Sequence, residues 1–154
     1  MTLYLDTSSL VKLYVTEPDS ELVRSLVDSA AVVATSSIAY TETRAALARR
    51  RREGALRPAH FTAAKRAFEA DWPNYLAVEV TSGLCRYAGD LAERYRLRAY
   101  DSVHLAAYAE VARHAGPAET RFSSFDKALT RAARSLGRTL RSGFRRRAKA
   151  ETVR

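Results

Sequence analysis

Three short apolar runs and a fourth short segment, each followed by a longer stretch with helical spacing, constrain the fold of this chain more than any other feature. Short runs of β-branched or bulky apolar residues predict buried strands, whereas apolar residues three and four positions apart predict helices. Strands that alternate with helices pair in parallel, so we expect an α/β layered fold. The predicted strands cover residues 3–5, 31–34, 76–80 and 121–124.

The stretches between these strands set the expected helix boundaries, and the chain continues beyond the last expected helix. The segment after Gly137 can add an edge strand at Thr139–Leu140, and we expect it to be irregular from Arg141 onward. We therefore predict one domain over residues 1–140 and a basic C-terminal tail over residues 141–154. Helices are expected over residues 7–15, 20–30, 37–54 and 58–73, from Thr81 or Ser82 to about Tyr95, from Asp101 past Tyr108, and from Asp126 to Gly137.

A single cysteine, Cys85, excludes an internal disulfide and any zinc site built from several cysteines. We expect Cys85 to be a small core residue. No apolar stretch approaches the roughly 20 residues that span a bilayer, and the first residues lack the features of a signal peptide. The sequence therefore predicts a cytoplasmic protein, and 154 residues are enough to bury a core without disulfides or a structural metal.

Positive charge is concentrated at the C-terminal end of the chain. The formal net charge is +9, and residues 121–154 carry 11 Lys or Arg against 2 acids, so the first 120 residues are neutral. A basic end of this kind predicts a polyanionic partner, most often a nucleic acid. The alternative is a solvated tail that only aids solubility, and charge does not distinguish RNA from DNA.

Three aspartates stand where predicted strands end or helices begin. Asp6 ends the first strand, Asp126 follows the fourth, and Asp101 opens a helix in a mostly apolar setting. Ligands of parallel sheets gather outside the carboxyl ends of the strands, so we expect these carboxylates to lie at one functional edge. Taken singly, each could instead cap the helix that follows it.

Glu42 is the least expected acid, because it lies on the helix face predicted to pack against the core. An unpaired carboxylate there is costly to desolvate, so it must meet an arginine, take up a proton or bind a cation. If that face is exposed instead, Glu42 forms a surface ion pair with a neighbour such as Arg44. The predicted core face is defined by Ile38, Ala45 and Ala46.

Four carboxylates in one cleft would repel each other, and this repulsion favours one or two divalent cations. Oxygen ligands without cysteine or a convincing histidine select Mg²⁺ or Mn²⁺. Such a site beside a basic flank fits hydrolysis of phosphodiester bonds, in which the metal activates a water and neutralises charge on the leaving oxygen.

Four sequence motifs surround these acids. They are YLDTSSLVKLY at residues 4–14, YTE at 40–42, LRAYDSVHLA at 97–106 and FSSFDKAL at 122–129. In order and spacing they resemble PIN-domain ribonucleases, most closely the VapC-type toxins of bacterial toxin–antitoxin pairs, over nearly the whole chain to about Gly137. The resemblance implies a three-layer α/β/α sandwich with a central, mainly parallel sheet of four to five strands. It also implies a Mg²⁺- or Mn²⁺-dependent endoribonuclease, a homodimer and a VapB-like antitoxin partner.

The resemblance also assigns roles to the acids. Asp6 and Asp101 would be direct metal ligands, while the other two acids ligate a second metal or hold coordinated waters, and one carboxylate helps to deprotonate the attacking water. The Ser8 and Ser124 hydroxyls would orient the ligands or the phosphate, and threonine is more familiar than serine at position 124. The candidate catalytic and metal-binding residues are Asp6, Glu42, Asp101 and Asp126.

Other signals leave alternatives open. His104 is either a hydrogen-bonded packing residue, which we favour, or a base. Residues 49–52, all arginine, continue the Glu42 helix away from the cleft and either contact RNA backbone or form a solvated helix end. The alternatives to a toxin endoribonuclease are a noncatalytic nucleic-acid-binding module and a PIN nuclease that processes RNA without an antitoxin. A pure binder gains nothing from four carboxylates facing phosphate.

Overall fold

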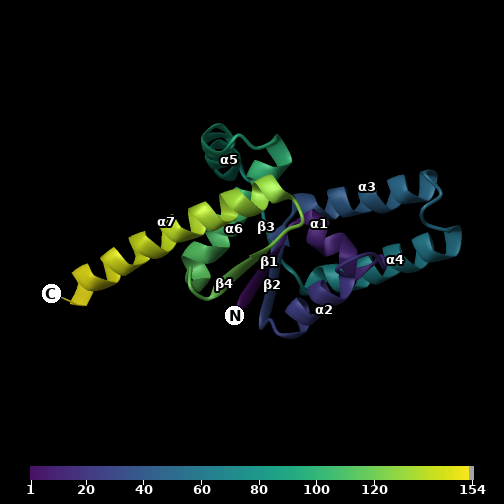
Figure 1. The fold of residues 1–154 in the computed structure, drawn as a ribbon, viewed down its shortest axis with the longest axis horizontal. Helices are drawn as coiled ribbons and strands as arrows, with labels where there is room; N and C mark the ends of the chain where they lie inside the picture. The colour runs from purple at the N-terminus through teal and green to yellow at the C-terminus, as the bar shows by residue number, and fades with distance from the viewer. Residues whose placement is uncertain (153–154) are drawn as a thin grey trace.

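The computed structural model describes residues 1–152, with side chains described to Arg146, around a central parallel sheet (Figure 1). The strands lie in the order β3-β2-β1-β4, and all three pairings are parallel. Leu5 of β1 is opposite Ser123 of β4, so the chain leaves both strands at the same edge of the sheet. The strands are β1 (Thr2–Leu5), β2 (Val32–Ser36), β3 (Leu76–Val78) and β4 (Thr120–Ser123).

Helices cover both faces of the sheet and complete the expected three layers. Successive side chains of β1 point to opposite faces, so Leu3 and Leu5 join one apolar cluster while Tyr4 joins the other. The first cluster packs the sheet against α1 to α4, and the second packs it against α5, α6 and α7. The helices are α1 (Thr7–Leu10), α2 (Ser20–Asp28), α3 (Ile38–Arg52), α4 (Pro58–Asp71), α5 (Ser82–Tyr95), α6 (Ala99–Ala115) and α7 (Lys127–Thr152), with short 3₁₀ turns η1 (Val11–Leu13) and η2 (Trp72–Asn74).

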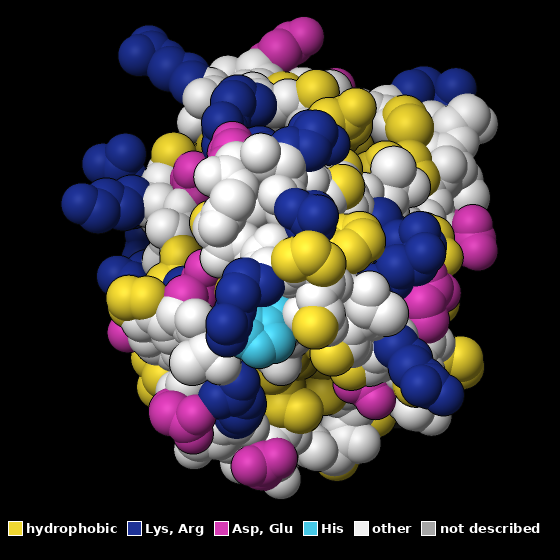
Figure 2. Space-filling view, turned by 90° about the vertical axis from the view of Figure 1, so that its right-hand side faces the viewer, with side chains coloured by type: hydrophobic (Ala, Val, Ile, Leu, Met, Phe, Trp, Pro, Cys, Tyr) yellow, Lys and Arg dark blue, Asp and Glu magenta, His cyan; other side chains and the backbone are white. Residues whose placement is uncertain are grey.

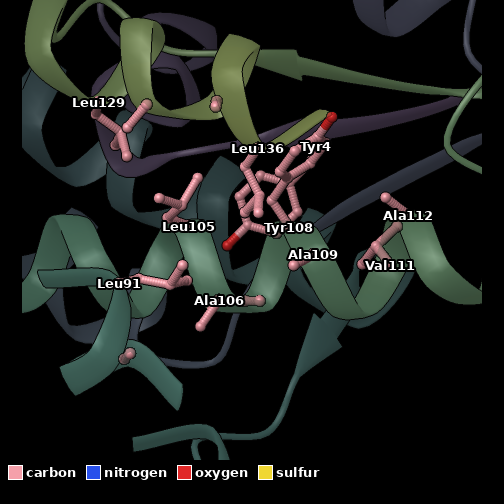
Figure 3. Packing of buried hydrophobic residues seen from close by; sticks show 14 of the residues in the cluster. Tyr4, Leu91, Leu105, Ala106, Tyr108, Ala109, Val111, Ala112, Leu129 and Leu136 are labelled. Atoms are coloured by element: carbon pink, nitrogen blue, oxygen red, sulfur yellow. The ribbon is translucent and has the colours of Figure 1, made fainter. Parts of the chain in front are cut away.

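Helix α6 is enclosed between the sheet, α5 and α7, and its alanines permit this close packing. The run from Leu105 to Ala109 is buried at every position. Figure 3 shows Tyr4 and Tyr108 beside Leu136 of α7, and the two tyrosine rings meet edge to face with centroids 6.0 Å apart, an arrangement that aromatic rings favour. This core fixes α6, and therefore its first turn, at the carboxyl edge of the sheet.

The predicted end of the last helix was wrong. Residues from Gly137 onward do not form an edge strand at Thr139–Leu140 or an irregular tail, because α7 continues to Thr152. The segment contains no proline and is rich in helix-forming Arg, Ala and Leu, so the two glycines lower helix stability without ending the helix. Gly137 has a packing role: a Cβ at this position would lie 3.1 Å from the Tyr108 hydroxyl, so glycine lets α7 approach α6 closely.

Three smaller differences follow from local structure. The first helix is shorter than predicted, since α1 ends at Leu10 and continues only as a 3₁₀ turn. The third strand ends at Val78, two residues early. Cys85 is exposed on α5 and is not the core residue we predicted. Within the residues that the structure describes, no helix is long and apolar enough to cross a membrane.

Candidate active site

A cleft of about 730 Å³ opens at the carboxyl edge of the sheet. Its walls come from the ends of β1 and β4 and from α1, α3 and α6, which are far apart in the sequence. All four predicted acids line this single cleft, so the structure brings the complete candidate set together: Asp6, Glu42, Asp101 and Asp126. This is the place at which ligands of parallel sheets are expected.

Asp6 is the most buried of these acids, with 4% of its surface exposed. Its Oδ1 accepts hydrogen bonds from the Ser9 backbone N–H (2.9 Å) and the Ser8 hydroxyl (2.8 Å), and its Oδ2 accepts one from the Ser124 hydroxyl (2.7 Å). Burial raises the pKa of Asp6, although the bonds from Ser124, Ser9 and Ser8 oppose this rise. Asp6 therefore caps α1 and also lines the cleft, so the two interpretations of this residue are compatible.

Glu42 is half-buried on α3 and shares its Oε2 between two donors. The Thr7 hydroxyl donates at 2.5 Å, and the Nε2 of His104 lies 2.7 Å away. Burial raises the pKa of Glu42, but the hydrogen bond and charge of His104 and the bond from Thr7 outweigh it and leave the pKa below its usual range. The buried stripe of α3 is one position away from our prediction, at Ala39, Thr43 and Leu47, so Glu42 faces the cleft and not the core.

His104 connects this carboxylate to the core of the protein. It is 2% exposed, and its Nδ1 lies 3.0 Å from the Tyr4 hydroxyl. Burial, with the charges of Asp6 and Glu42, holds the pKa of Tyr4 well above its usual range, so the phenol stays neutral. Because a carboxylate only accepts hydrogen bonds, the Nε2 facing Glu42 carries a proton. His104 is therefore buried and hydrogen-bonded at both ring nitrogens, which confirms it as a hydrogen-bonded residue, and it orients Glu42.

Asp101 and Asp126 are joined by Arg98, which the sequence analysis did not identify. The Arg98 guanidinium pairs with Asp101 Oδ2 at 2.9 Å and with Asp126 Oδ2 at 3.4 Å. Asp126 also caps α7, accepting the Leu129 N–H at 2.7 Å. Asp101 does not cap α6 as predicted, because that helix begins at Ala99 and places Asp101 in its first turn. The only signal for Arg98 is its position three residues before Asp101, on the same side of a helix start.

The donor set fits a hard divalent cation in its chemistry. The four acids offer carboxylate oxygens as ligands, and serine and threonine hydroxyls lie beside them. Among the described residues, no three Asp, Glu, His or Cys side chains are already arranged to hold a metal ion. Each acid is instead turned toward a protein donor, and the Arg98 guanidinium is a positive group that bridges two of them. Binding of a cation by Asp101 and Asp126 therefore requires these two side chains to exchange Arg98 for the cation.

Basic side chains form much of the remaining wall. Arg49, Arg50 and Arg52 line the cleft, so the prediction that the arginine run leads away from it was wrong. The Glu17 carboxylate accepts hydrogen bonds from both Arg50 (2.6 Å) and Lys12 (3.0 Å), which fixes these two basic side chains in place. Figure 2 views the molecule from the side of the α3 and α4 ends, and Lys and Arg side chains are spread across that face. The cleft combines an acidic floor with a basic rim, which suits a phosphate-bearing ligand.

Comparison with known proteins agrees with this geometry. A sequence model of the PIN domain family matches residues 3–135. Ribonuclease VapC45 of Mycobacterium tuberculosis (strain CDC 1551 / Oshkosh) is 40% identical over 103 residues, which cover 67% of this chain and 72% of that protein. Ribonuclease VapC49 of M. tuberculosis (strain ATCC 25618 / H37Rv) matches with the same identity and coverage.

Proposed function

We propose that this chain, which belongs to the PIN-domain family, is a metal-dependent endoribonuclease of the VapC toxin type. The observation that carries the proposal is the convergence of four carboxylates, from four separate segments of the chain, on one basic-rimmed cleft. Two relatives named ribonuclease support RNA as the substrate. Phosphodiester hydrolysis needs both a site for divalent cations and positive groups for the phosphate, and the cleft offers each.

The proposed cation is Mg²⁺ or Mn²⁺, held directly by Asp6 and Asp101. Glu42 and Asp126 would ligate a second cation or hold its waters in place. When bound, the cation lowers the pKa of water and neutralises negative charge on the phosphate. The chain's own groups hold these ligands: the Ser124 and Ser8 hydroxyls fix Asp6 in one orientation. Preformed positions of this kind reduce the reorganisation that the reaction requires.

Glu42 is the candidate acceptor for the proton of the attacking water. Its Oε2 is occupied by Thr7 and His104, and the other carboxylate oxygen, Oε1, is left for a water or a cation in the cleft. Its lowered pKa keeps Glu42 ionised near neutral pH, as a base requires. Arg49 and Arg52, on the rim, are placed to contact phosphates of the substrate.

The proposed partners follow from the same comparison. VapC toxins pair with VapB antitoxins, and we propose a VapB-like inhibitor that covers the cleft, together with a homodimer and action in the cytoplasm. We also propose that residues 1–140 form the nuclease domain and that residues 141–154 are a basic extension. Helix α7 crosses this boundary without a break, and the last two residues lie outside the described part of the chain.

Cleavage of total RNA by the purified protein tests the proposed function. We expect discrete fragments in Mg²⁺ or Mn²⁺, none in EDTA, and none from Asp6→Asn. The matched control is Asp90→Asn, which removes an exposed carboxylate on α5 away from the cleft and should cleave as the wild type does. RNA binding without metal-dependent cleavage would instead indicate a noncatalytic binding module.

A further inference from the structure

Helix α7 carries a continuous row of basic side chains along one face. Successive members are four, three, four, three and four residues apart, which is the spacing that keeps side chains on one side of an α-helix. All six are exposed. We name this row the α7 basic stripe, and its members are Lys127, Arg131, Arg134, Arg138, Arg141 and Arg145.

The opposite face of α7 holds the stripe in a fixed direction. Leu129, Leu136 and Leu140 pack with the core cluster around α6, so the stripe must point outward. Arg141 is at the edge of the stripe and lies back beside Gly137, whereas the other members stand clear of the core face. The yellow end of α7 extends beyond the rest of the molecule in Figure 1, so the outer part of the stripe is open to a large partner.

The stripe has no internal counter-charge among the side chains that the structure describes. None of its six members forms an ion pair, whereas arginines of the body such as Arg44, Arg50 and Arg113 are each paired with a glutamate. Like charges three and four residues apart destabilise a helix. A row of them without partners therefore favours binding of an external polyanion, which would remove that repulsion.

The position of the stripe indicates which polyanion it binds. Lys127, its first member, directly follows Asp126 of the cleft, so the stripe leads outward from the candidate active site. From Lys127 to Arg145 the helix rises roughly 27 Å at 1.5 Å per residue. That length corresponds to about eight nucleotides at about 3.4 Å of rise per nucleotide in a stacked strand.

We propose that the α7 basic stripe binds the phosphate backbone of the RNA strand whose scissile bond lies in the cleft. This inference rests on the proposed function, because it extends the substrate site along the outer face of α7. Contacts of this type carry no sequence information, so the stripe provides affinity and direction while the cleft provides chemistry.

The test compares two variants of the full chain that lose the same charge. The stripe variant is Arg131→Gln, Arg134→Gln, Arg138→Gln and Arg145→Gln, and glutamine keeps the helix propensity of α7. The control variant replaces four exposed arginines at α4 and α5: Arg57→Gln, Arg66→Gln, Arg86→Gln and Arg94→Gln. Circular dichroism and thermal unfolding check that both variants fold.

Binding is measured in EDTA by fluorescence anisotropy, with a labelled single-stranded RNA of about 30 nucleotides and a series of KCl concentrations. Each phosphate contact contributes about 0.7 to the slope of log K against log salt for single strands. The stripe variant is expected to lose about 2.8 of that slope and to bind roughly tenfold or more weakly at low salt. The control variant should keep the slope of the wild type.

Each outcome separates this inference from the proposed function. Equal slopes for the stripe and control variants would overturn the inference, whether or not the wild type cleaves RNA. A selective loss of slope in a protein that never cleaves would support RNA binding by the stripe, but it would refute the proposed nuclease and, with it, the placement of a scissile bond in the cleft. Sedimentation with phosphatidylglycerol vesicles provides the last arm: loss of vesicle binding with an unchanged RNA slope would identify a membrane as the partner and overturn the inference.

Discussion

The cleft and the outer face of α7 use charge in opposite ways. In the cleft, each of the four candidate acids accepts a hydrogen bond or an ion pair from the chain itself. On α7, six basic side chains have no ion-pair partner among the described residues. Internal partners fix a group at one position, as chemistry requires, whereas unpartnered charges on a helix surface bind a flexible polymer without fixing its register. Substitutions in the two regions should therefore have different kinetic signatures.

The largest effects should come from the two proposed direct metal ligands, Asp6 and Asp101, and Asp101→Asn provides a second test beside Asp6→Asn. Loss of a direct metal ligand is expected to reduce the cleavage rate by about 10²–10³-fold, the range seen when one essential electrostatic group is removed. Asp101 adds a favourable charge in the first turn of α6, worth about 0.3–1 kcal/mol, and an ion pair with the exposed Arg98, so the fold should remain. Single-turnover cleavage and thermal unfolding measure the two effects, and retention of full activity would remove Asp101 from the site.

Substitution of His104, which hydrogen-bonds and orients Glu42, should have a smaller effect on metal affinity and activity. Removing a group that orients a metal ligand costs about 10–100-fold in metal affinity or activity. We expect a loss in that range for His104→Leu and partial recovery in His104→Gln, which keeps a donor toward Glu42. Mn²⁺ titration by calorimetry, followed by cleavage assays, gives the readout. Equal affinity for Mn²⁺ in His104→Leu and the wild type would show that His104 only fills space.

Substitution of Arg98 should strengthen metal binding, whereas substitution of His104 should weaken it. Its guanidinium is 80% exposed and competes with a cation for Asp101 and Asp126, so Arg98→Gln is expected to tighten Mn²⁺ binding by about three- to tenfold, the scale of exposed ion pairs. Arg94→Gln, on the neighbouring helix, is the matched control. Weaker Mn²⁺ binding in Arg98→Gln would mean that Arg98 assembles the site instead of competing for it.

The buried carboxylate of Asp6, which the proposed chemistry needs, should lower the free energy of unfolding at neutral pH. Burial raises its pKa, so the folded state holds a proton more tightly than the unfolded state, and stability falls as pH rises through the folded pKa. Asp6→Asn keeps an acceptor for the Ser9 N–H but carries no charge. Urea unfolding at pH 7 should therefore find Asp6→Asn at least as stable as the wild type. A clear destabilisation would show that the hydrogen bonds to the charge outweigh its desolvation.

The smallest effect concerns Glu42 and its contribution to the loss of protein stability at low pH. Its pKa is lowered in the folded protein, so its contribution to stability is present above the unfolded pKa of about 4.3 and is lost as pH falls through the folded pKa. Glu42→Gln should remove part of the decline in unfolding free energy below that pH. Parallel urea titrations from pH 3 to 7 test this, and identical acid profiles would contradict it.

The sequence predicted the parts of this molecule that depend on local pattern. Asp6 and Asp126 could be placed at the sheet edge because Asp6 directly follows β1 and Asp126 lies three residues after β4, and parallel strands share that edge. Glu42 was also identified, but its assigned helix face was one position away, because the packing of Thr43 and Leu47 depends on what α3 meets.

The remaining features depend on contacts between distant segments. The Tyr4–His104–Glu42 connection joins three elements and leaves no periodic trace in the sequence. Gly137 was interpreted as a helix end, since glycine is common there, whereas it lies inside α7, where a Cβ would make a tight contact of 3.1 Å with the Tyr108 hydroxyl. That error concealed the length of α7, and with it the continuity of the stripe.

One comparison tests whether the cleft carries out cleavage while the α7 basic stripe provides RNA affinity. RNA binding in EDTA and single-turnover cleavage in Mn²⁺ at saturating RNA are compared for the wild type, Asp6→Asn and the stripe variant. We expect Asp6→Asn to bind RNA as the wild type does but not to cleave it. We expect the stripe variant to bind weakly, yet to cleave at the wild-type rate once saturated. Cleavage by Asp6→Asn, or a stripe variant that stays slow at saturation, would refute these roles of the cleft and of α7.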